Sequence, residues 1–138
     1  MQYFVTGATG FIGKRLVQKL LLRKGAVVHV LIRPGSEAKL KDLREFCGVS
    51  AARLLPVSGD LKAKKLGVAA EQIKALKGKI DHAYHLAAIY DLGADEASQV
   101  EVNVEGTRNT VEFVKAIDAG HFHHVSSIAA AGLYEGVF

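Results

Sequence analysis

The sequence predicts an α/β fold in which helices cover both faces of a parallel sheet. Apolar runs bounded by turn residues alternate with helical patterns along the chain. The runs at 4–5 and 27–32 are nearly continuous in apolar residues, as expected for parallel strands that are buried on both faces. Right-handed crossovers from a central first strand then give the strand order 3-2-1-4-5.

Five strands and four connecting helices are expected. The strands are predicted at 3–6, 27–32, 53–57, 82–86 and 122–127. The helices are predicted at 11–22, from an N-cap at Ser36 through Leu40, Leu43 and Phe46, at 71–76, and at 96–117. In the first helix Phe11, Ile12, Leu16 and Leu20 are expected to share one apolar face.

Composition limits the class of protein. With 138 residues, of which 49% are hydrophobic and 23% charged, the chain can form one packed domain and is not disordered. The single cysteine, Cys47, excludes an internal disulfide and is typical of a reducing compartment. No apolar run approaches the roughly 20 residues of a membrane span, and the N-terminus shows no charged leader, so we expect a cytoplasmic protein.

Charge is unevenly distributed along the chain. Residues 1–80 hold 16 Lys and Arg against 5 Asp and Glu, whereas residues 81–138 hold 2 against 9. The basic half could face an anionic partner or a phosphorylated small molecule, but scattered surface charges are most often only solvated. Lys62, Lys64 and Lys65 have no aromatic residues among them, so a solvated loop is expected there and no nucleic-acid surface.

The strongest chemical signal is Thr6-Gly7-Ala8-Thr9-Gly10-Phe11-Ile12-Gly13, between the first strand and the first helix. Gly7 permits a tight turn, Gly10 lets a pyrophosphate approach the backbone, and Gly13 lets the helix pack closely on the sheet. The free N–H groups and the positive dipole end of the helix favour phosphate. We therefore predict a Rossmann-type dinucleotide-binding domain over 1–138. The alternative is a tight strand-to-helix corner without a ligand.

The end of the second strand indicates which dinucleotide binds. An acidic residue there would accept a hydrogen bond from the ribose 2′-hydroxyl of NAD. Here the sequence reads Leu31-Ile32-Arg33-Pro34, and Arg33 suits a 2′-phosphate through charge-assisted hydrogen bonds. NADP is therefore the predicted cofactor and NAD the less favoured one. Alternatively, Arg33 is only a surface residue at the start of a loop.

Further along, the chain resembles the extended short-chain dehydrogenase/reductases. The resemblance rests on five segments in order: the glycine motif, Gly59-Asp60-Leu61, His85-Leu86-Ala87-Ala88, Asn103 in Asn-Val-Glu-Gly-Thr, and Val125-Ser126-Ser127. Residues 85–92, His-Leu-Ala-Ala-Ile-Tyr-Asp-Leu, are similar to those of acyl-CoA reductases, 3β-hydroxysteroid dehydrogenases and dihydroflavonol-reductase relatives.

The resemblance implies roles for single residues. Asp60 and Leu61 would contact adenine, and Leu86, Ala87 and Ala88 would lie beside the nicotinamide ribose. Asn103 and Ser126 would complete the cofactor site, and Ser127 would assist catalysis by donating to a substrate carbonyl oxygen. Each also has an ordinary explanation: Asp60 opens a turn, the alanines fill a core, and the serines end a strand.

One family feature is missing. The family uses a Tyr-x-x-x-Lys pair as proton donor, but Tyr3, Tyr84, Tyr90 and Tyr134 are followed four residues later by Gly, Ala, Ala and Phe. In the family this pair lies beyond the fifth strand. We therefore expect the chain to be the N-terminal cofactor-binding part of a longer enzyme, truncated after the fifth strand and inactive by itself.

The histidines do not predict a metal site. His121, His123 and His124 lie on one strand, where alternate residues face the same side and neighbours do not. No carboxylate or cysteine completes a coordination shell, so no metal is expected.

These observations favour the NADP-binding part of an oxidoreductase that moves hydride between nicotinamide and a carbonyl or hydroxyl of a fairly apolar small molecule. A homo-oligomer is compatible with this function. The alternatives are a sugar-nucleotide epimerase or dehydratase of the same family, which Arg33 disfavours, and a non-catalytic NADP-sensing regulator.

Overall fold

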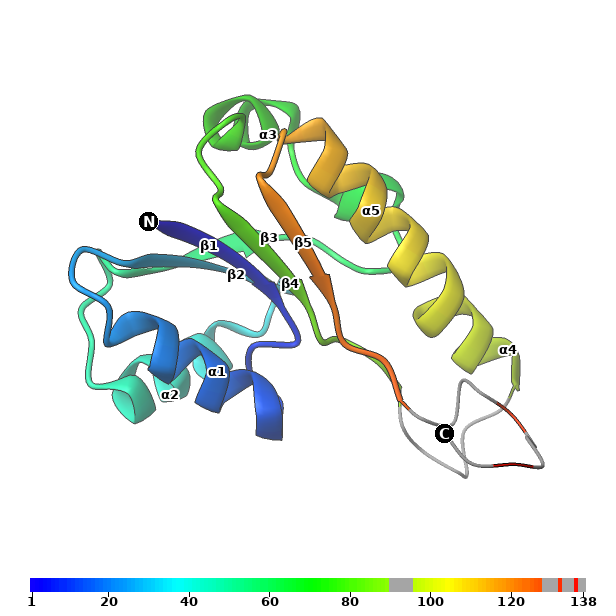
Figure 1. Cartoon of the computed structure of the whole chain (residues 1–138), viewed down its shortest axis with the longest axis horizontal. Coiled ribbons are helices and arrows are strands. Elements are labelled where there is room, and N and C mark those ends of the chain that lie inside the picture. Colours follow the sequence, from blue (N-terminus) through cyan, green and yellow to red (C-terminus); the bar gives the residue numbers. More distant parts are fainter. Residues whose placement is uncertain (90–95, 128–131, 133–135, 137–138) are drawn as a thin grey trace.

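The computed structural model describes residues 1–89, 96–127, 132 and 136. Its centre is one five-stranded sheet with the order β3-β2-β1-β4-β5, and every pairing is parallel (Figure 1). The predicted Rossmann-type topology and the central position of β1 are confirmed.

The strands are β1 (Gln2–Thr6), β2 (Val27–Ile32), β3 (Leu54–Ser58), β4 (His82–His85) and β5 (His121–His124). The helices are α1 (Phe11–Leu21), α2 (Glu37–Cys47), a 3₁₀ turn η1 (Lys64–Gly67), α3 (Ala70–Leu76), α4 (Glu96–Gln99), the π-helical segment η2 (Val100–Glu105) and α5 (Gly106–Ala116). Among the described residues, no helix has the length and apolar character needed to cross a bilayer.

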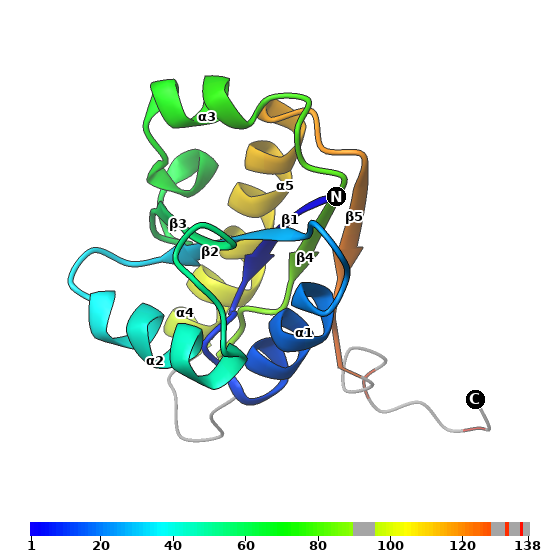
Figure 2. The same ribbon diagram turned by 90° about the vertical axis from the view of Figure 1, so that its left-hand side faces the viewer.

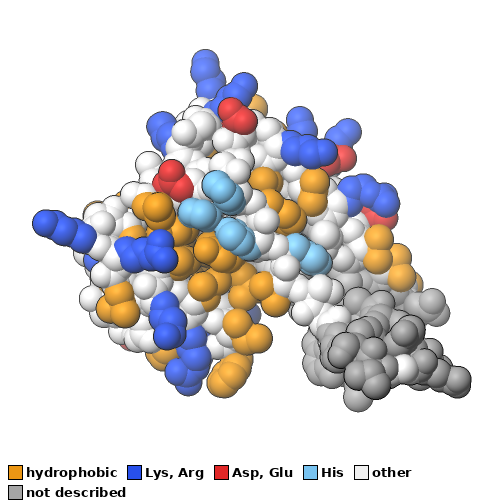
Figure 3. Space-filling model, viewed as in Figure 1, with side chains coloured by type: hydrophobic (Ala, Val, Ile, Leu, Met, Phe, Trp, Pro, Cys, Tyr) orange, Lys and Arg blue, Asp and Glu red, His pale blue; other side chains and the backbone are white. Residues whose placement is uncertain are grey.

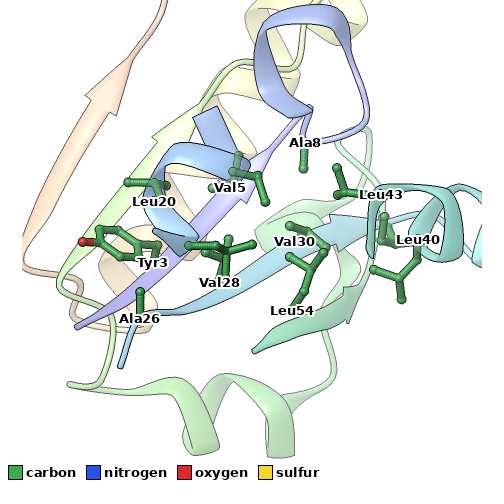
Figure 4. Close-up of a cluster of buried hydrophobic side chains, with 13 residues drawn as sticks. Tyr3, Val5, Ala8, Leu20, Ala26, Val28, Val30, Leu40, Leu43 and Leu54 are labelled. Carbon is green, nitrogen blue, oxygen red and sulfur yellow. The ribbon is translucent and has the colours of Figure 1, made fainter. Parts of the chain in front are cut away.

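Helices cover both faces of the sheet because side chains alternate along β1. Tyr3 and Val5 pack toward α1 and α2, in a cluster that includes Val28, Val30 and Leu54 (Figure 4). Phe4 points the other way and packs on Phe113 of α5, with ring centroids 4.8 Å apart. Figure 2 shows α1 and α2 on one side of the sheet and α3 and α5 on the other.

The long helix predicted over 96–117 is present but not uniform. Regular α-helix at α4 and α5 flanks the π-helical η2, which contains Asn103. π-Helical turns are rare in proteins, and those that occur are often found at functional sites. The apolar period of the sequence predicts a helix but does not distinguish a π segment within it.

The exposure of the first α1 residues and the end of β5 differ from the predictions. Phe11 and Ile12 were expected on the buried face of α1, but they are 74% and 62% exposed. They occupy the first turn of the helix, next to the glycine turn, and the buried face begins at Gly13 and Val17. β5 was expected to reach Ser127 but ends at His124, although the Val125 N–H still donates to the His85 carbonyl at 3.0 Å.

Lys62, Lys64 and Lys65, which were expected in a solvated loop, are exposed, but the adjoining Leu66 orders part of the segment after β3 by its burial. Lys65 and Leu66 adopt positive φ angles of 49° and 61°, and Leu66 is completely buried. The Leu66 carbonyl accepts the Asp60 N–H at 2.8 Å. The burial of one leucine thus offsets an unfavourable backbone conformation and closes the loop behind Asp60.

The sheet face on the α1 side is covered unevenly. α1 and α2 pack over β1, β2 and β3, whereas the rings of His82, Tyr84, His121 and His123 lie over β4 and β5. Figure 3 shows this histidine group at the surface beside apolar side chains. Within the described residues, β5 pairs only with β4.

We predict that the 138-residue chain self-associates through β5, because an edge strand offers unpaired backbone groups to another chain. Phe122 and Val125 on this edge are 37% and 47% exposed, and neither lysine nor proline interrupts the segment 122–127. Ile128, which the sequence adds to this apolar edge, lies outside the described residues. Sedimentation velocity at rising concentration should show a growing average mass.

The Val125→Lys variant should reduce this association, because a lysine on an edge discourages strand pairing. A parent chain that remains folded and monomeric at all concentrations would contradict the prediction.

Candidate functional site

A cavity of about 540 Å³ opens at the carboxyl edge of the sheet, where parallel α/β folds bind ligands. It is formed by the segments that follow β1, β2, β3 and β4, which the sheet order brings to one place. The predicted site residues that line it are Gly7, Thr9, Gly10, Arg33, Asp60, Leu61, Leu86, Ala87 and Ala88. Segments that lie far apart in the sequence thus meet in one cavity.

Two of the three glycines in the motif are required by close backbone contacts. A Cβ atom on Gly7 would lie 2.7 Å from the Ala87 nitrogen, and the φ angle of Gly7 is +70°. A Cβ atom on Gly13 would overlap the Gly7 carbonyl oxygen. Gly7 therefore lets the β1 turn approach the β4 turn, and Gly13 lets α1 begin directly against the glycine turn.

Gly10 differs from the other two. It is exposed, has φ of −72°, and precedes the first residue of α1. A Cβ atom there would lie 3.3 Å from the Gly7 carbonyl oxygen, a tight but not prohibitive distance. Because the N–H groups at a helix start lack intrahelical partners, a bare backbone at Gly10 leaves them accessible to an anion.

The end of the cavity beside β2 and β3 is basic. Arg33 lines it together with Lys39 and Lys62, and Ser36 adds a hydroxyl group. Arg33 was predicted to bind the cofactor and Lys39 was not, while Lys62 was expected in a solvated loop and Ser36 as an N-cap. Lys39 is one turn into α2, and its proximity to Arg33 depends on how α2 leaves the β2 loop. Ser36 precedes α2 as predicted, but its side chain makes no capping hydrogen bond.

Asp60 opens a turn, which was the alternative explanation for this residue, and it also lines the cavity. One carboxylate oxygen accepts the Lys62 backbone N–H at 2.9 Å. The Lys62 ammonium lies 2.6 Å from a Glu101 carboxylate oxygen, and this hydrogen bond raises the pKa of Lys62. The ion pair connects the β3 loop to η2 at the rim of the cavity.

The β4 wall of the cavity is fixed from two sides. The Ala87 N–H donates to Thr6 Oγ1 at 3.3 Å, and the Leu86 N–H donates to the Thr6 carbonyl at 3.3 Å. On the other side, Asn103 Oδ1 accepts the Ile89 N–H at 2.8 Å, while Asn103 Nδ2 donates to the Ile89 carbonyl at 3.0 Å. Asn103 therefore holds the backbone of this wall, a role that the sequence alone did not specify.

Six predicted residues are not among those that line the cavity, and Asn103, which binds the Ile89 backbone, is one of them. Phe11 and Ile12 are exposed, and Gly13 is buried at the base of the motif. Ser126 and Ser127 are exposed and follow the end of β5. The structure therefore does not bring the predicted catalytic serine into contact with this cavity.

His85 lies under the β4 wall and is 1% exposed. Burial lowers its pKa to about 4, with a smaller contribution in the same direction from the charge of His124. Its Nδ1 is 2.6 Å from Thr6 Oγ1, and its Nε2 is 3.0 Å from Thr107 Oγ1. The ring is therefore neutral at pH 7 and hydrogen-bonded on both sides.

The β5 histidines divide between the two sheet faces. His123 lies 3.0 Å from His82, Nε2 to Nδ1, on the α1 side, whereas His124 stacks near His85 on the other side. Within the residues that the structure describes, no group of three His, Cys, Asp or Glu side chains is placed to hold a metal.

Alanine substitutions should distinguish the packing role of Gly13 from the expected ligand-binding role of Gly10. Gly13→Ala should lower the free energy of unfolding by at least about 2 kcal/mol, because its Cβ meets backbone atoms that cannot move aside. Gly10→Ala should cost under about 1 kcal/mol of stability but weaken nucleotide binding. Urea unfolding and calorimetric titration measure the two effects, and equal stability losses would contradict this division.

Acid should destabilise the fold before the carboxylates titrate. The pKa of His85 is lower in the folded chain than in the unfolded chain, so the unfolded chain takes up the proton first as the pH falls below about 6.5. Burial also lowers the pKa of His29. The free energy of unfolding should therefore fall by about 1–2 kcal/mol between pH 7 and pH 5.

Urea unfolding at the two pH values measures this difference. The His85→Asn variant should show a smaller loss between them, because it lacks the group that titrates. An unchanged loss in that variant would refute the assignment to His85.

Comparison with known proteins agrees with this geometry. The family model described as male sterility protein matches residues 5–137. A linear gramicidin synthase protein from Brevibacillus parabrevis is 34% identical over 96% of this chain, which spans 3% of that protein. A putative fatty acyl-CoA reductase from Drosophila melanogaster is 27% identical over 90% of this chain, which spans 27% of it.

Solved structures share the fold. The terminal R domain from the myxalamid PKS-NRPS biosynthetic pathway superposes with a TM-score of 0.82 at 26% identity, covering 99% of this chain and 37% of that one. UDP-glucuronic acid 4-epimerase from Bacillus cereus, solved in complex with NAD, gives a TM-score of 0.70 at 29% identity, covering 98% and 43%. These matches, with the sheet order and the glycine turn, support a nicotinamide-nucleotide fold. The chain belongs to the male sterility protein family, within the extended short-chain dehydrogenase/reductases.

Proposed function

We propose that this chain binds NADP(H) and forms the cofactor-binding part of a reductase. The family supports an NAD(P)-dependent oxidoreductase of the reductase type. The choice of NADP rests on one observation: Arg33 lines the cavity directly after β2, where an NAD enzyme places a carboxylate. Lys39 adds a positive charge and Ser36 a hydroxyl group at the same end of the cavity, whereas the charge of Lys62 is paired with Glu101.

The residues present fit such a cofactor. Gly7, Gly10 and the start of α1 leave bare backbone where a pyrophosphate needs N–H donors, and a Cβ atom at Gly7 would collide with Ala87. Arg33 and Lys39 would hold the 2′-phosphate, Asp60 would accept from the adenine amino group, and small Ala87 and Ala88 leave room for the nicotinamide ribose.

When bound, NADPH supplies the hydride, and the protein supplies orientation and electrostatics. The cavity walls that do this are the glycine turn and the Leu86–Ile89 segment, which Thr6 and Asn103 hold in place. Ser127 is proposed to donate to a substrate carbonyl oxygen as negative charge develops there.

The proposed substrate is a carbonyl or hydroxyl group of a fairly apolar small molecule. The name of the acyl-CoA reductase relative supports this class. A sugar-nucleotide epimerase is the second candidate, since a structural neighbour of that kind was solved with NAD. Arg33 disfavours it, because a positive charge in place of an acidic residue suits a 2′-phosphate and not a free hydroxyl pair.

Catalysis is proposed to need residues outside this chain. The chain spans 37% of the R-domain chain and 27% of the fatty acyl-CoA reductase. The sequence contains no Tyr-x-x-x-Lys pair.

Localisation in the cytoplasm is part of the proposal and rests on the single cysteine, Cys47.

NADP(H) should bind more tightly than NAD(H), by about tenfold or more, because only the 2′-phosphate gains the charge-assisted contact with Arg33. The Arg33→Ala variant should lose most of this preference and retain its affinity for NAD(H). Calorimetric titration with all four nucleotides measures both effects.

Lys24→Ala is the matched control, since it removes an exposed positive charge from the α1–β2 loop at the opposite edge of the sheet. Its nucleotide preference should equal that of the parent. Equal affinities of the parent for NADP and NAD would refute the cofactor assignment.

The 138-residue chain should bind nucleotide but reduce no carbonyl substrate, because it lacks the tyrosine proton donor. Following NADPH absorbance in the presence of long-chain aldehydes and acyl thioesters tests this. Turnover that disappears in Ser127→Ala would contradict the prediction, because this chain would then supply the proton without the tyrosine.

A further inference from the structure

A line of hydrogen bonds runs beneath the β4 wall, and the binding roles proposed above leave its centre unexplained. Thr6 Oγ1 contacts Nδ1 of His85 at 2.6 Å, and Nε2 of His85 contacts Thr107 Oγ1 at 3.0 Å. The Thr107 hydroxyl donates to the Asn103 carbonyl at 2.7 Å. Asn103 in turn holds the Ile89 backbone through both ends of its side-chain amide. This line joins β1 to the π-helical η2.

The donors and acceptors in this line of hydrogen bonds can be assigned one after another. The Thr107 hydroxyl has a single proton, which goes to the Asn103 carbonyl, so its oxygen can only accept from His85. Nε2 of His85 therefore carries the ring proton, and Nδ1 accepts from the Thr6 hydroxyl. The Thr6 oxygen still accepts the Ala87 N–H. A neutral imidazole with its proton on Nε2 satisfies all four contacts.

A positively charged His85 ring would disrupt these hydrogen bonds. Its Nδ1 would become a donor to Thr6 Oγ1, where the Ala87 N–H already donates, and the Thr6 hydroxyl proton would lose its acceptor. The neighbours packed on the ring do not compensate such a charge. Thr6 and Thr107 are uncharged, Phe122 is apolar, and His124 stacks at 5.4 Å between ring centroids.

We propose that His85 is a positioning residue whose Nε2–H tautomer couples the glycine turn to the η2 segment and thereby fixes the Leu86–Ile89 wall. Thr6 determines where Ala87 lies, Asn103 determines where Ile89 lies, and His85 with Thr107 keeps these two anchors at a constant separation. The inference rests on the proposed function, because this wall would lie against the nicotinamide half of the dinucleotide.

Thr107 is the residue through which this coupling can be tested. Thr107→Val removes the hydroxyl with little change of volume, so His85 loses its acceptor and the Asn103 carbonyl loses a donor. Thr107→Ser restores the hydroxyl. Thr110→Val is a matched control, because buried Thr110 makes the same kind of bond to the Gly106 carbonyl at 2.7 Å, one turn further along α5, without contacting His85.

Three measurements on the 138-residue chain test this proposal. Long-range ¹H–¹⁵N spectra of the imidazole at pH 7 should show His85 neutral and protonated on Nε2. The dissociation constant for NADPH should rise about tenfold in Thr107→Val, as expected for the loss of a buried hydrogen-bond partner, and change less than about threefold in Thr107→Ser and Thr110→Val. Hydrogen exchange of the Ile89 amide should be faster in Thr107→Val alone.

An Nδ1–H tautomer or a charged ring in the parent at pH 7 would overturn the proposal. Folded Thr107→Val that matches Thr110→Val in both NADPH affinity and Ile89 exchange would also overturn it. If the parent does not bind NADPH, the proposed function fails. The ring tautomer and the Ile89 exchange rates then still decide whether His85 couples the two segments.

Discussion

The close approach of the β1 turn to the β4 turn is the constraint on which the site depends. Gly7 has no Cβ, and one would lie 2.7 Å from the Ala87 nitrogen, so the two backbones can touch. Thr6, one residue earlier, binds the Leu86 and Ala87 backbone with its carbonyl and its hydroxyl. One strand end thus positions both the glycine turn and the facing β4 wall of the cavity.

Much of this could be predicted from the sequence because it depends on local pattern. Continuous apolar runs specify buried parallel strands, and the glycine turn between strand and helix places the site at the end of β1. Arg33 could be identified for the same reason, since it directly follows a strand whose carboxyl end must face the site. The edges of elements were less predictable. Phe11 and Ile12 fit the helical period but lie exposed in the first turn of α1.

The features that could not be predicted arise from tertiary contacts. Lys39 and Lys62 reach the cavity through the path of α2 and through a loop whose left-handed residues are stabilised by the burial of Leu66. The hydrogen bonds between the Asn103 side chain and the Ile89 backbone depend on the π-helical turn. The spacing of apolar residues in the sequence does not reveal such a turn. Asn103 was identified through the family resemblance, but its backbone-holding contact is visible only in the folded chain.

Backbone amide chemical shifts of the ¹⁵N-labelled chain, titrated with NADP⁺, test most directly whether the carboxyl-edge cavity is the nucleotide site. Saturable shifts should appear together at Gly7–Gly13, Arg33, Asp60–Lys62 and Leu86–Ile89, while the surface at His82, His121 and His123 stays unchanged. Saturable shifts confined to that histidine surface, or the absence of saturable shifts at millimolar nucleotide, would contradict the account.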